Sequence, residues 1–148
     1  MIYDCFSYWD EDLLLDLRLN ILNKFVDYFV IVEGNKTWQN NLKKLKFDIK
    51  KFNNFKNKII YVPVTDLPDG EDPYLRENHQ RNAIVNGLQK ANDNDLIIIS
   101  DLDEIPDPKK INLFDPKKKY AVFKQKHFYY KFNLRSIKFP DWYGSRIC

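Results

Sequence analysis

The sequence predicts an α/β protein built around a mostly parallel sheet, and three observations support this prediction. Short apolar runs alternate with segments of helical periodicity, which is the pattern of successive βαβ units. The runs at 28–32 and 96–99 are almost continuously apolar, as in strands that are buried on both faces of a sheet. Acidic residues directly follow both runs, at the strand ends where open α/β sheets bind ligands.

The amino-terminal part is predicted to form a strand, a helix and a second strand. The first strand covers 1–9, and the acids at 10–12 then open a helix, because negative charge is favoured at a helix amino terminus. The second strand covers 27–33 and ends at a glycine–asparagine turn. Apolar side chains at helical spacing are predicted to form the buried stripe of the helix. They are Leu14, Leu17 and Ile21, flanked by Leu13, Leu15 and Leu22.

The middle of the chain is predicted to add a third strand and a second helix. The polar segment 36–58 is interpreted as a helix or a long loop, and a strand at 59–64 follows it. Small side chains that repeat every four residues predict a helix at 74–91. They are Ala83, Gly87 and Ala91.

The carboxyl-terminal part is predicted to contain a short helix at 109–114 and a strand at 120–132, where apolar and polar residues alternate. No internal repeat or linker divides the sequence, so 1–148 is predicted to form one domain. The segment 139–148 ends without a stopping signal, in the manner of ordered structure cut in mid-course. We therefore expect the domain to be incomplete at its carboxyl end.

Composition narrows the classes of protein. With 44% hydrophobic and 16% aromatic residues, the chain can bury a core and is not of the disordered class. The net charge of +3 is mild, and the lysine-rich stretch 43–58 lacks the signature of a nucleic-acid-binding module, which favours a solvated surface. Cys5 and Cys148 lack zinc-site spacing. Without a signal peptide or a long apolar run, the chain as given is predicted to be cytoplasmic.

The most informative motif consists of Asp101, Asp103 and Glu104, directly after the apolar run at 96–99. Asp101 and Asp103 are two residues apart, so in extended backbone their side chains point to the same side. Two hard oxygen ligands on one side suit a divalent cation that keeps several waters and also holds substrate phosphates. Acid clusters in loops can instead be solvated or can cap the next helix, and this alternative stays open.

The acidic motif is the Asp-x-Asp arrangement of glycosyltransferases that use nucleotide sugars. With the segments around it, the chain resembles glycosyltransferase family 17, the β-1,4-mannosyl-glycoprotein β-1,4-N-acetylglucosaminyltransferase family. The matching pieces lie at 3–6 with 11–19, at 26–33, at 80–84 and at 95–106, and aromatic residues at 128–130 and 142–144 continue the pattern.

The resemblance implies a GT-A-type nucleotide-binding fold and transfer of a sugar, with inversion, to a glycan hydroxyl. It implies a UDP-sugar donor, above all UDP-N-acetylglucosamine, with Mn²⁺ or Mg²⁺ as the metal ion. A β-1,4-mannosyl-glycoprotein would be the acceptor, so the process would be N-glycan synthesis. For the animal members the family implies the Golgi membrane, whereas this chain shows no anchor.

Residue roles follow from the resemblance. Asp103 is expected to be the principal metal ligand, and Asp101 is expected to reach the metal through water or to bind the ribose. Glu104 is a weaker metal candidate, with a surface acid or a cap as the alternative. Glu33, at the end of the second strand, is expected to accept hydrogen bonds from the uracil or the ribose. Its alternative is a strand-end acid in solvent or paired with a lysine.

Three further residues complete the expected site. Arg81 is expected to hold a phosphate or to brace Asp101, because its planar fork suits both groups; a helical i,i+4 pair with Glu77 is the alternative. Asn82 would support the same loop. Asp141 is a speculative general base, because it is the acid beside Trp142 and Tyr143, which could stack on a sugar or belong to the core.

The sequence alone leaves three other functions open. A chain truncated after the nucleotide-binding half would bind a UDP-sugar without turnover. A phosphatase or nuclease could use the same acids, but Ile105 occupies the position of the threonine in an Asp-x-Asp-x-Thr nucleophile motif. Nucleic-acid binding through 43–58 has the least support.

Overall fold

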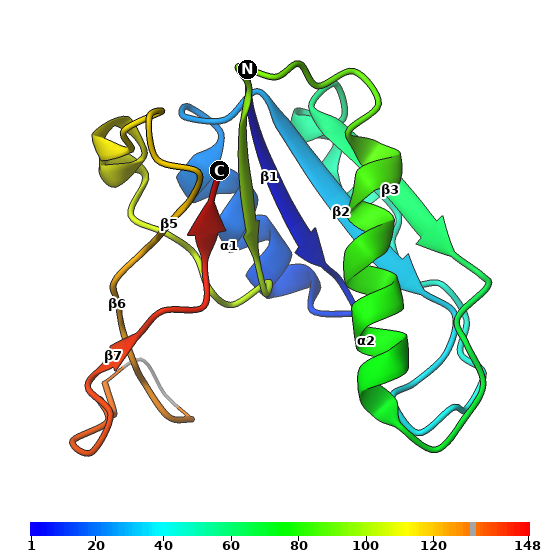
Figure 1. The fold of residues 1–148 in the computed structure, drawn as a ribbon. Coiled ribbons are helices and arrows are strands. Elements are labelled where there is room, and N and C mark those ends of the chain that lie inside the picture. The colour runs from blue at the N-terminus through cyan, green and yellow to red at the C-terminus, as the bar shows by residue number, and fades with distance from the viewer. Residues whose placement is uncertain (131–132) are drawn as a thin grey trace.

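The computed structural model describes residues 1–130 and 133–148, and these form an α/β domain (Figure 1). Within the described residues, a six-stranded sheet has the order β3-β2-β1-β4-β8-β5. Its first four strands are mutually parallel, and β8 runs antiparallel to both β4 and β5. The strands are β1 (Ile2–Ser7), β2 (Tyr28–Gly34), β3 (Ile59–Val64), β4 (Leu96–Ser100), β5 (Ala121–Val122) and β8 (Arg146–Ile147). The predicted α/β class with a mostly parallel sheet is confirmed.

Helical segments cover both faces of this sheet (Figure 1). On one face lie α1 (Asp12–Leu22) and the 3₁₀ segment η1 (Ile49–Phe55). On the other lie α2 (Pro73–Asn82) and the 3₁₀ segment η2 (Ala83–Gly87). Because successive side chains of a strand point to opposite faces, β1 and β2 contribute to two separate cores.

The prediction of which side chains of α1 are buried is wrong. Leu17 and Ile21 are exposed, whereas Leu15, Leu19 and Leu22 are buried. Arg18 lies in the middle of this buried face because it pairs with a buried acid of β1. A count of apolar residues alone could not detect a helix face that is organised around a cation.

Two other predicted elements are also divided differently. The predicted helix at 74–91 is α2 followed by η2, and Gly87 is buried where a Cβ atom would overlap Val30 of β2. The predicted strand at 120–132 is two short strands, β5 and β6 (Gln125–Lys126), and its last two residues lie outside the described residues. β6 pairs with β7 (Asp141–Trp142) in a hairpin beside the main sheet (Figure 1). The predicted short helix at 109–114 is the 3₁₀ segment η3 (Pro108–Leu113).

The order of the strands creates a switch point between β1 and β4. From β1 the chain passes through α1 to β2 on one side, and after β3 it passes through α2 to β4 on the other side of β1. In open α/β sheets, ligands bind outside the carboxyl ends of strands at such a point. None of the helices formed by the described residues has the length and apolar character of a membrane-spanning segment.

Candidate donor-binding site

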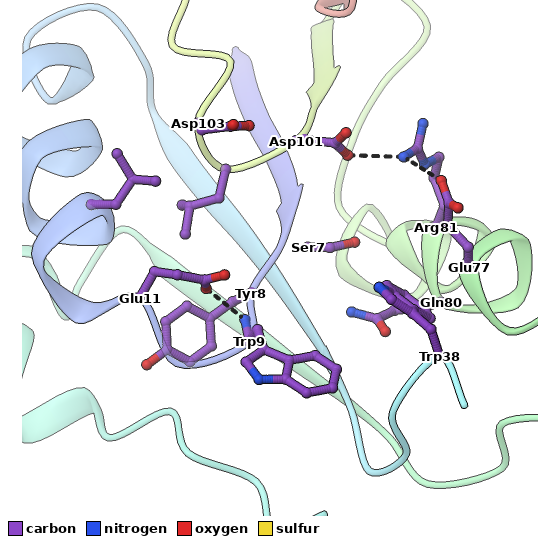
Figure 2. Close-up of a pocket in the computed structure, with 12 residues that line it drawn as sticks. Ser7, Tyr8, Trp9, Glu11, Trp38, Glu77, Gln80, Arg81, Asp101 and Asp103 are labelled. Carbon is purple, nitrogen blue, oxygen red and sulfur yellow. Dashed lines mark hydrogen bonds and ion pairs between the residues drawn. The ribbon is translucent and has the colours of Figure 1, made fainter. Parts of the chain in front are cut away.

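A pocket of about 430 Å³ lies at the carboxyl ends of β1 and β4, at the switch point (Figure 2). Segments far apart in the sequence line it. They are Ser7, Tyr8, Trp9, Glu11 and Leu14 from the β1–α1 region, Trp38 after β2, Glu77, Gln80 and Arg81 from α2, and Asp101, Leu102 and Asp103 after β4. Figure 2 shows the acids after β4 on one side of this space and Trp9 and Trp38 on another.

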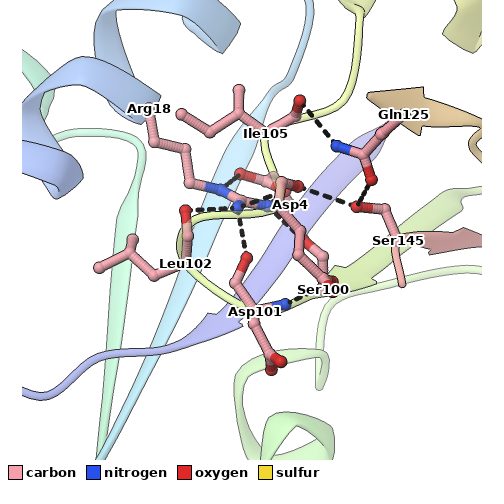
Figure 3. Close-up of polar contacts among 9 residues, drawn as sticks. Asp4, Arg18, Ser100, Asp101, Leu102, Ile105, Gln125 and Ser145 are labelled. Carbon is pink, nitrogen blue, oxygen red and sulfur yellow. Dashed lines mark hydrogen bonds and ion pairs between the residues drawn. The ribbon is translucent and has the colours of Figure 1, made fainter. Parts of the chain in front are cut away.

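A buried arginine holds the acidic loop in place (Figure 3). The Nε and Nη2 atoms of Arg18 donate to the two carboxylate oxygens of Asp4 at 2.8 and 2.7 Å. Nη2 also donates to the hydroxyl of Ser100 at 2.6 Å. Nη1 donates to the backbone carbonyls of Asp101 at 2.8 Å and Leu102 at 3.0 Å. The guanidinium therefore joins β1, α1 and the loop that carries the acids.

Sequence reasoning missed this pair, although the signal was present. Asp4 interrupts the apolar first strand, and Arg18 interrupts the apolar side of the first helix. Both side chains are fully buried. A buried charge requires a partner, so an acid in a buried strand and an arginine on the helix packed against it could have been matched.

Glu104 does not line this pocket, and its carboxylate is hydrogen-bonded to other groups of the protein. Its carboxylate accepts hydrogen bonds from the backbone N–H of Asp101, at 3.0 Å, and from the indole N–H of Trp142. A Cβ atom at Gly144 would overlap this carboxylate. The alternative was a surface acid or a cap of the next turn, but the carboxylate is mostly buried and instead caps the turn that precedes it. Its metal-binding role finds no support in these contacts.

Asp101 and Asp103 remain at the pocket surface. Asp101 forms an ion pair with Nη2 of Arg81 at 2.8 Å, and the same nitrogen contacts Glu77 at 3.1 Å (Figure 2). Both alternatives for Arg81, the brace of Asp101 and the i,i+4 pair, therefore occur together. Asp103 is exposed and forms no side-chain hydrogen bond or ion pair with the described residues. Those residues contain no group of three or more acids, histidines or cysteines gathered as a complete metal site.

Glu33 is buried outside this pocket, and its oxygens are occupied. It accepts hydrogen bonds from the ammonium of Lys43 at 2.7 Å and from the backbone N–H groups of Lys46 at 2.7 Å and Phe47 at 3.0 Å. The hydroxyl of Tyr61 donates to it at 3.0 Å, and burial together with this carboxylate raises the pKa of Tyr61. The lysine-paired alternative describes Glu33, and both of its carboxylate oxygens accept hydrogen bonds within the protein.

Asn82 and Asp141 are not brought to the pocket. Asn82 is exposed at the end of α2 and is not among the lining residues. Asp141 forms ion pairs with Lys124 at 2.8 Å and Arg135 at 3.6 Å, within a different cavity beside Trp142. Because Asp141 does not line the pocket that carries Asp101 and Asp103, the structure gives no support to Asp141 as the base.

The aromatic residues of the pocket were not predicted as site residues. Trp9 and Trp38 lie with ring centroids 6.3 Å apart, and the ammonium of Lys43 lies 4.8 Å from the ring centroid of Trp9. Gln80 donates to the carbonyl of Val32 at 3.1 Å, which fixes α2 against β2. The tryptophans lie in loops, where no periodicity indicates their orientation.

Comparison with known proteins identifies the family of the chain. The model of glycosyltransferase family 17 matches residues 1–145. The chain is 32% identical over 103 residues to the human and rat proteins, and 31% identical to the mouse protein, named beta-1,4-mannosyl-glycoprotein 4-beta-N-acetylglucosaminyltransferase. Each match covers 63% of this chain and 19% of the relative, so the chain spans about a fifth of the length of these relatives. No solved structure matches the chain. Since the family model covers nearly every residue, the chain belongs to glycosyltransferase family 17.

Proposed function

We propose that this chain forms the donor-binding part of a GT-A-like glycosyltransferase. It would transfer N-acetylglucosamine from UDP-N-acetylglucosamine, with inversion, to a β-1,4-mannosyl-glycoprotein acceptor of the kind named for its relatives. One observation carries the proposal: Asp101 and Asp103 remain exposed at the switch-point pocket, next to Arg81, whereas Glu33 and Glu104 are occupied inside the protein. An open α/β sheet with a nucleotide at this edge is the arrangement expected of such a fold.

The exposed acids fit a divalent metal ion. Mg²⁺ and Mn²⁺ bind through one or two carboxylates together with waters and substrate phosphates, so a complete protein cage is not required. Asp103, which has no partner among the described residues, would be the direct ligand, and Asp101 would contact the metal through water or bind the ribose. When bound, the metal ion supplies Lewis-acid stabilisation of the diphosphate leaving group.

Arg81 and the tryptophans would bind the rest of the donor. Nη2 of Arg81 donates to Asp101 and Glu77. Its Nε and Nη1 atoms make no hydrogen bond with the described residues. These nitrogens can donate to a diphosphate. The ring of Trp9 or Trp38 can stack against uracil, since aromatic rings bind bases through their faces.

A UDP-sugar-binding module without turnover is the second candidate. It is favoured by one observation: Asp141, the expected base, is paired with Lys124 and Arg135 and does not line the pocket. Inverting transfer requires a group within hydrogen-bond reach of the acceptor hydroxyl. Donor hydrolysis and transfer assays separate this module from an enzyme, because the module would bind the donor and release no UDP.

Calorimetric titration of UDP and UDP-N-acetylglucosamine, with and without Mn²⁺, tests the donor site. We expect Mn²⁺-dependent binding by the wild type and its loss in Asp103→Ala. Asp93→Ala is the matched control, because Asp93 is also an exposed loop acid but lies outside the pocket. Equal affinity of all three proteins, or no binding by the folded wild type, would contradict the proposal.

A further inference from the structure

A second cavity adjoins the proposed donor pocket at the acidic pair. Its volume is about 280 Å³, and Asp101 and Asp103 line both cavities. His127 and Trp142 line the second cavity and also a further cavity of about 680 Å³. The three cavities are therefore neighbours, and we call the row that they form from the acids to the β6–β7 hairpin the path.

Exposed aromatic rings line the distal part of this path. We call His127, Tyr129, Trp142 and Tyr143 the aromatic ledge. The exposed fraction is 46% for Tyr129, 44% for Trp142 and 50% for Tyr143. His127 lies 4.6 Å from Tyr129 and 5.1 Å from Trp142, measured between ring centroids. Aromatic rings gathered at a surface cavity indicate a binding surface rather than a core.

Hydrogen bonds from Trp142 and from residues beside the ledge connect it to the acidic loop. The Trp142 indole donates to the carboxylate of Glu104, and the hydroxyl of Ser145 donates to the Glu104 carbonyl at 2.8 Å. The amide of Gln125 in β6 donates to the carbonyl of Ile105 at 2.9 Å (Figure 3). A ligand on the ledge would therefore keep a fixed position relative to Asp101 and Asp103.

We propose that the aromatic ledge binds the carbohydrate chain of the acceptor and leads its reacting sugar to the acidic pair. This rests on the proposed function for the position of the donor. The apolar faces of pyranose rings would lie on Tyr129 and Tyr143, while sugar hydroxyls would meet polar groups between the rings.

The polar groups of the path suit hydroxyls. Nδ1 of His127 lies 3.1 Å from the carbonyl oxygen of Phe139. A carbonyl only accepts, so Nδ1 carries the hydrogen, and Nε2 of the neutral ring is left as an acceptor for a hydroxyl. Lys126 is exposed in the second cavity and can donate. Both aromatic rings and hydrogen-bonding groups line the path, which favours a carbohydrate over a purely apolar segment of protein.

The test is titration of a glycopeptide that carries β-1,4-linked mannose, in the presence of UDP and Mn²⁺, followed by NMR. Tyr143→Ala and Tyr129→Ala are expected to weaken glycopeptide binding roughly tenfold each, because each removes a ring that covers an apolar sugar face. Tyr120→Ala is the matched control: Tyr120 is 69% exposed and lines none of these cavities. The affinity for UDP, measured in parallel, should be the same in all of these variants.

The outcomes separate the two proposals. Wild type that binds UDP but no glycopeptide, or Tyr143→Ala and Tyr129→Ala variants that bind it like Tyr120→Ala, would overturn the ledge. If the wild type binds glycopeptide on the ledge but does not bind UDP, the proposal for the ledge is supported and the proposed donor site is refuted. Self-association that depends on Tyr143, with no glycopeptide binding, would make the ledge a contact between copies of the chain and would also overturn the proposal.

Discussion

β2 and β4 are parallel strands on either side of β1, and acids stand at the carboxyl ends of both, yet these acids have opposite environments. After β2, backbone N–H groups at 46–47 and the ammonium of Lys43 fold over Glu33 and bury it. After β4, Arg18 hydrogen-bonds the backbone of the loop, and the side chains of Asp101 and Asp103 are left exposed. The loop that follows a strand, rather than the edge of the sheet, decides whether an acid is structural or available to a ligand.

The largest expected effect is on stability, from Glu33→Ala. The substitution leaves a nearly buried ammonium and several N–H and O–H donors without an acceptor. Removing one partner from a buried charge pair costs about 3–5 kcal/mol. We expect a decrease of this size in the free energy of unfolding, measured by urea denaturation.

Asp103→Ala is the matched change at the other strand end. Its carboxylate is exposed and has no partner among the described residues, so the unfolding free energy should stay within about 0.5 kcal/mol of wild type. If both variants were equally destabilised, the contrast between the strand ends would be wrong.

Gly144→Ala should disturb the loop after β4, because Gly144 packs against the buried side of that loop. The new methyl group would overlap the Glu104 carboxylate, which must move away from its hydrogen bonds with Asp101 and Trp142. Overpacking of this kind costs about 1–3 kcal/mol. We expect that loss of stability, together with weaker donor binding, in thermal unfolding and calorimetry. Combining it with Glu104→Ala removes the nearer of the two overlapping groups and leaves the indole nitrogen of Trp142. The effects should therefore be less than additive, and fully additive effects in the double variant would refute this explanation.

Arg81→Ala tests the cation of the exposed strand end. It removes the partner of Asp101 and a donor to the proposed diphosphate, so the affinity for UDP should fall roughly tenfold, as for one lost charge-assisted hydrogen bond. Stability should change little, because the ion pair is partly exposed. Titration of UDP measures the first effect and urea denaturation the second. Unchanged UDP affinity would assign Arg81 to the helix surface alone.

The smallest expected effect concerns Asp12, an acid of intermediate exposure at the start of α1. Hydrogen bonds from Lys51 and Tyr8 lower its pKa below the usual value of 3.8. Because the folded-state pKa is lowered, this stabilisation is complete well above 3.8 and is lost as the pH falls through the folded value. Both members of the Lys51 pair are more than a third exposed, so the loss should be below about 1 kcal/mol.

The measurement for Asp12 is the unfolding free energy from about pH 5 to about pH 2. The wild type should lose slightly more stability over this range than Asp12→Asn. Parallel pH profiles of the two proteins would show that the pair does not contribute.

Much of the fold could be predicted because burial on both faces leaves a strong signal. The continuous runs at 59–64 and 96–99 mark β3 and β4 within a residue. The register of α1 could not be found by apolar periodicity, since Arg18 occupies its buried face. The end of α2 at Asn82 depends on close packing of η2 against β2, which no local pattern encodes.

The candidate site was predictable in part. Asp101 and Asp103, which were predicted from their place after a buried strand, line the pocket, and the predicted contact between Arg81 and Asp101 is present. Their roles in binding a metal ion and a donor stay predictions. The environment of Glu33 depends on the path of the loop at 43–47, and polar loop sequences leave that path open. The pairing of Asp141 depends on the hairpin of β6 and β7, whose strands are only two residues each and carry little periodicity.

The hydrogen bonds of the Arg18 guanidinium link the proposed donor site to the cooperativity of folding. Its hydrogen bonds to Ser100, Asp101 and Leu102 join residues 82 to 84 positions apart, so the acidic loop can take its shape only when β1, α1 and β4 are already assembled. A ligand that binds only the folded state stabilises that state by mass action. A nucleotide in this pocket would therefore raise the melting temperature of the whole domain rather than order a single loop.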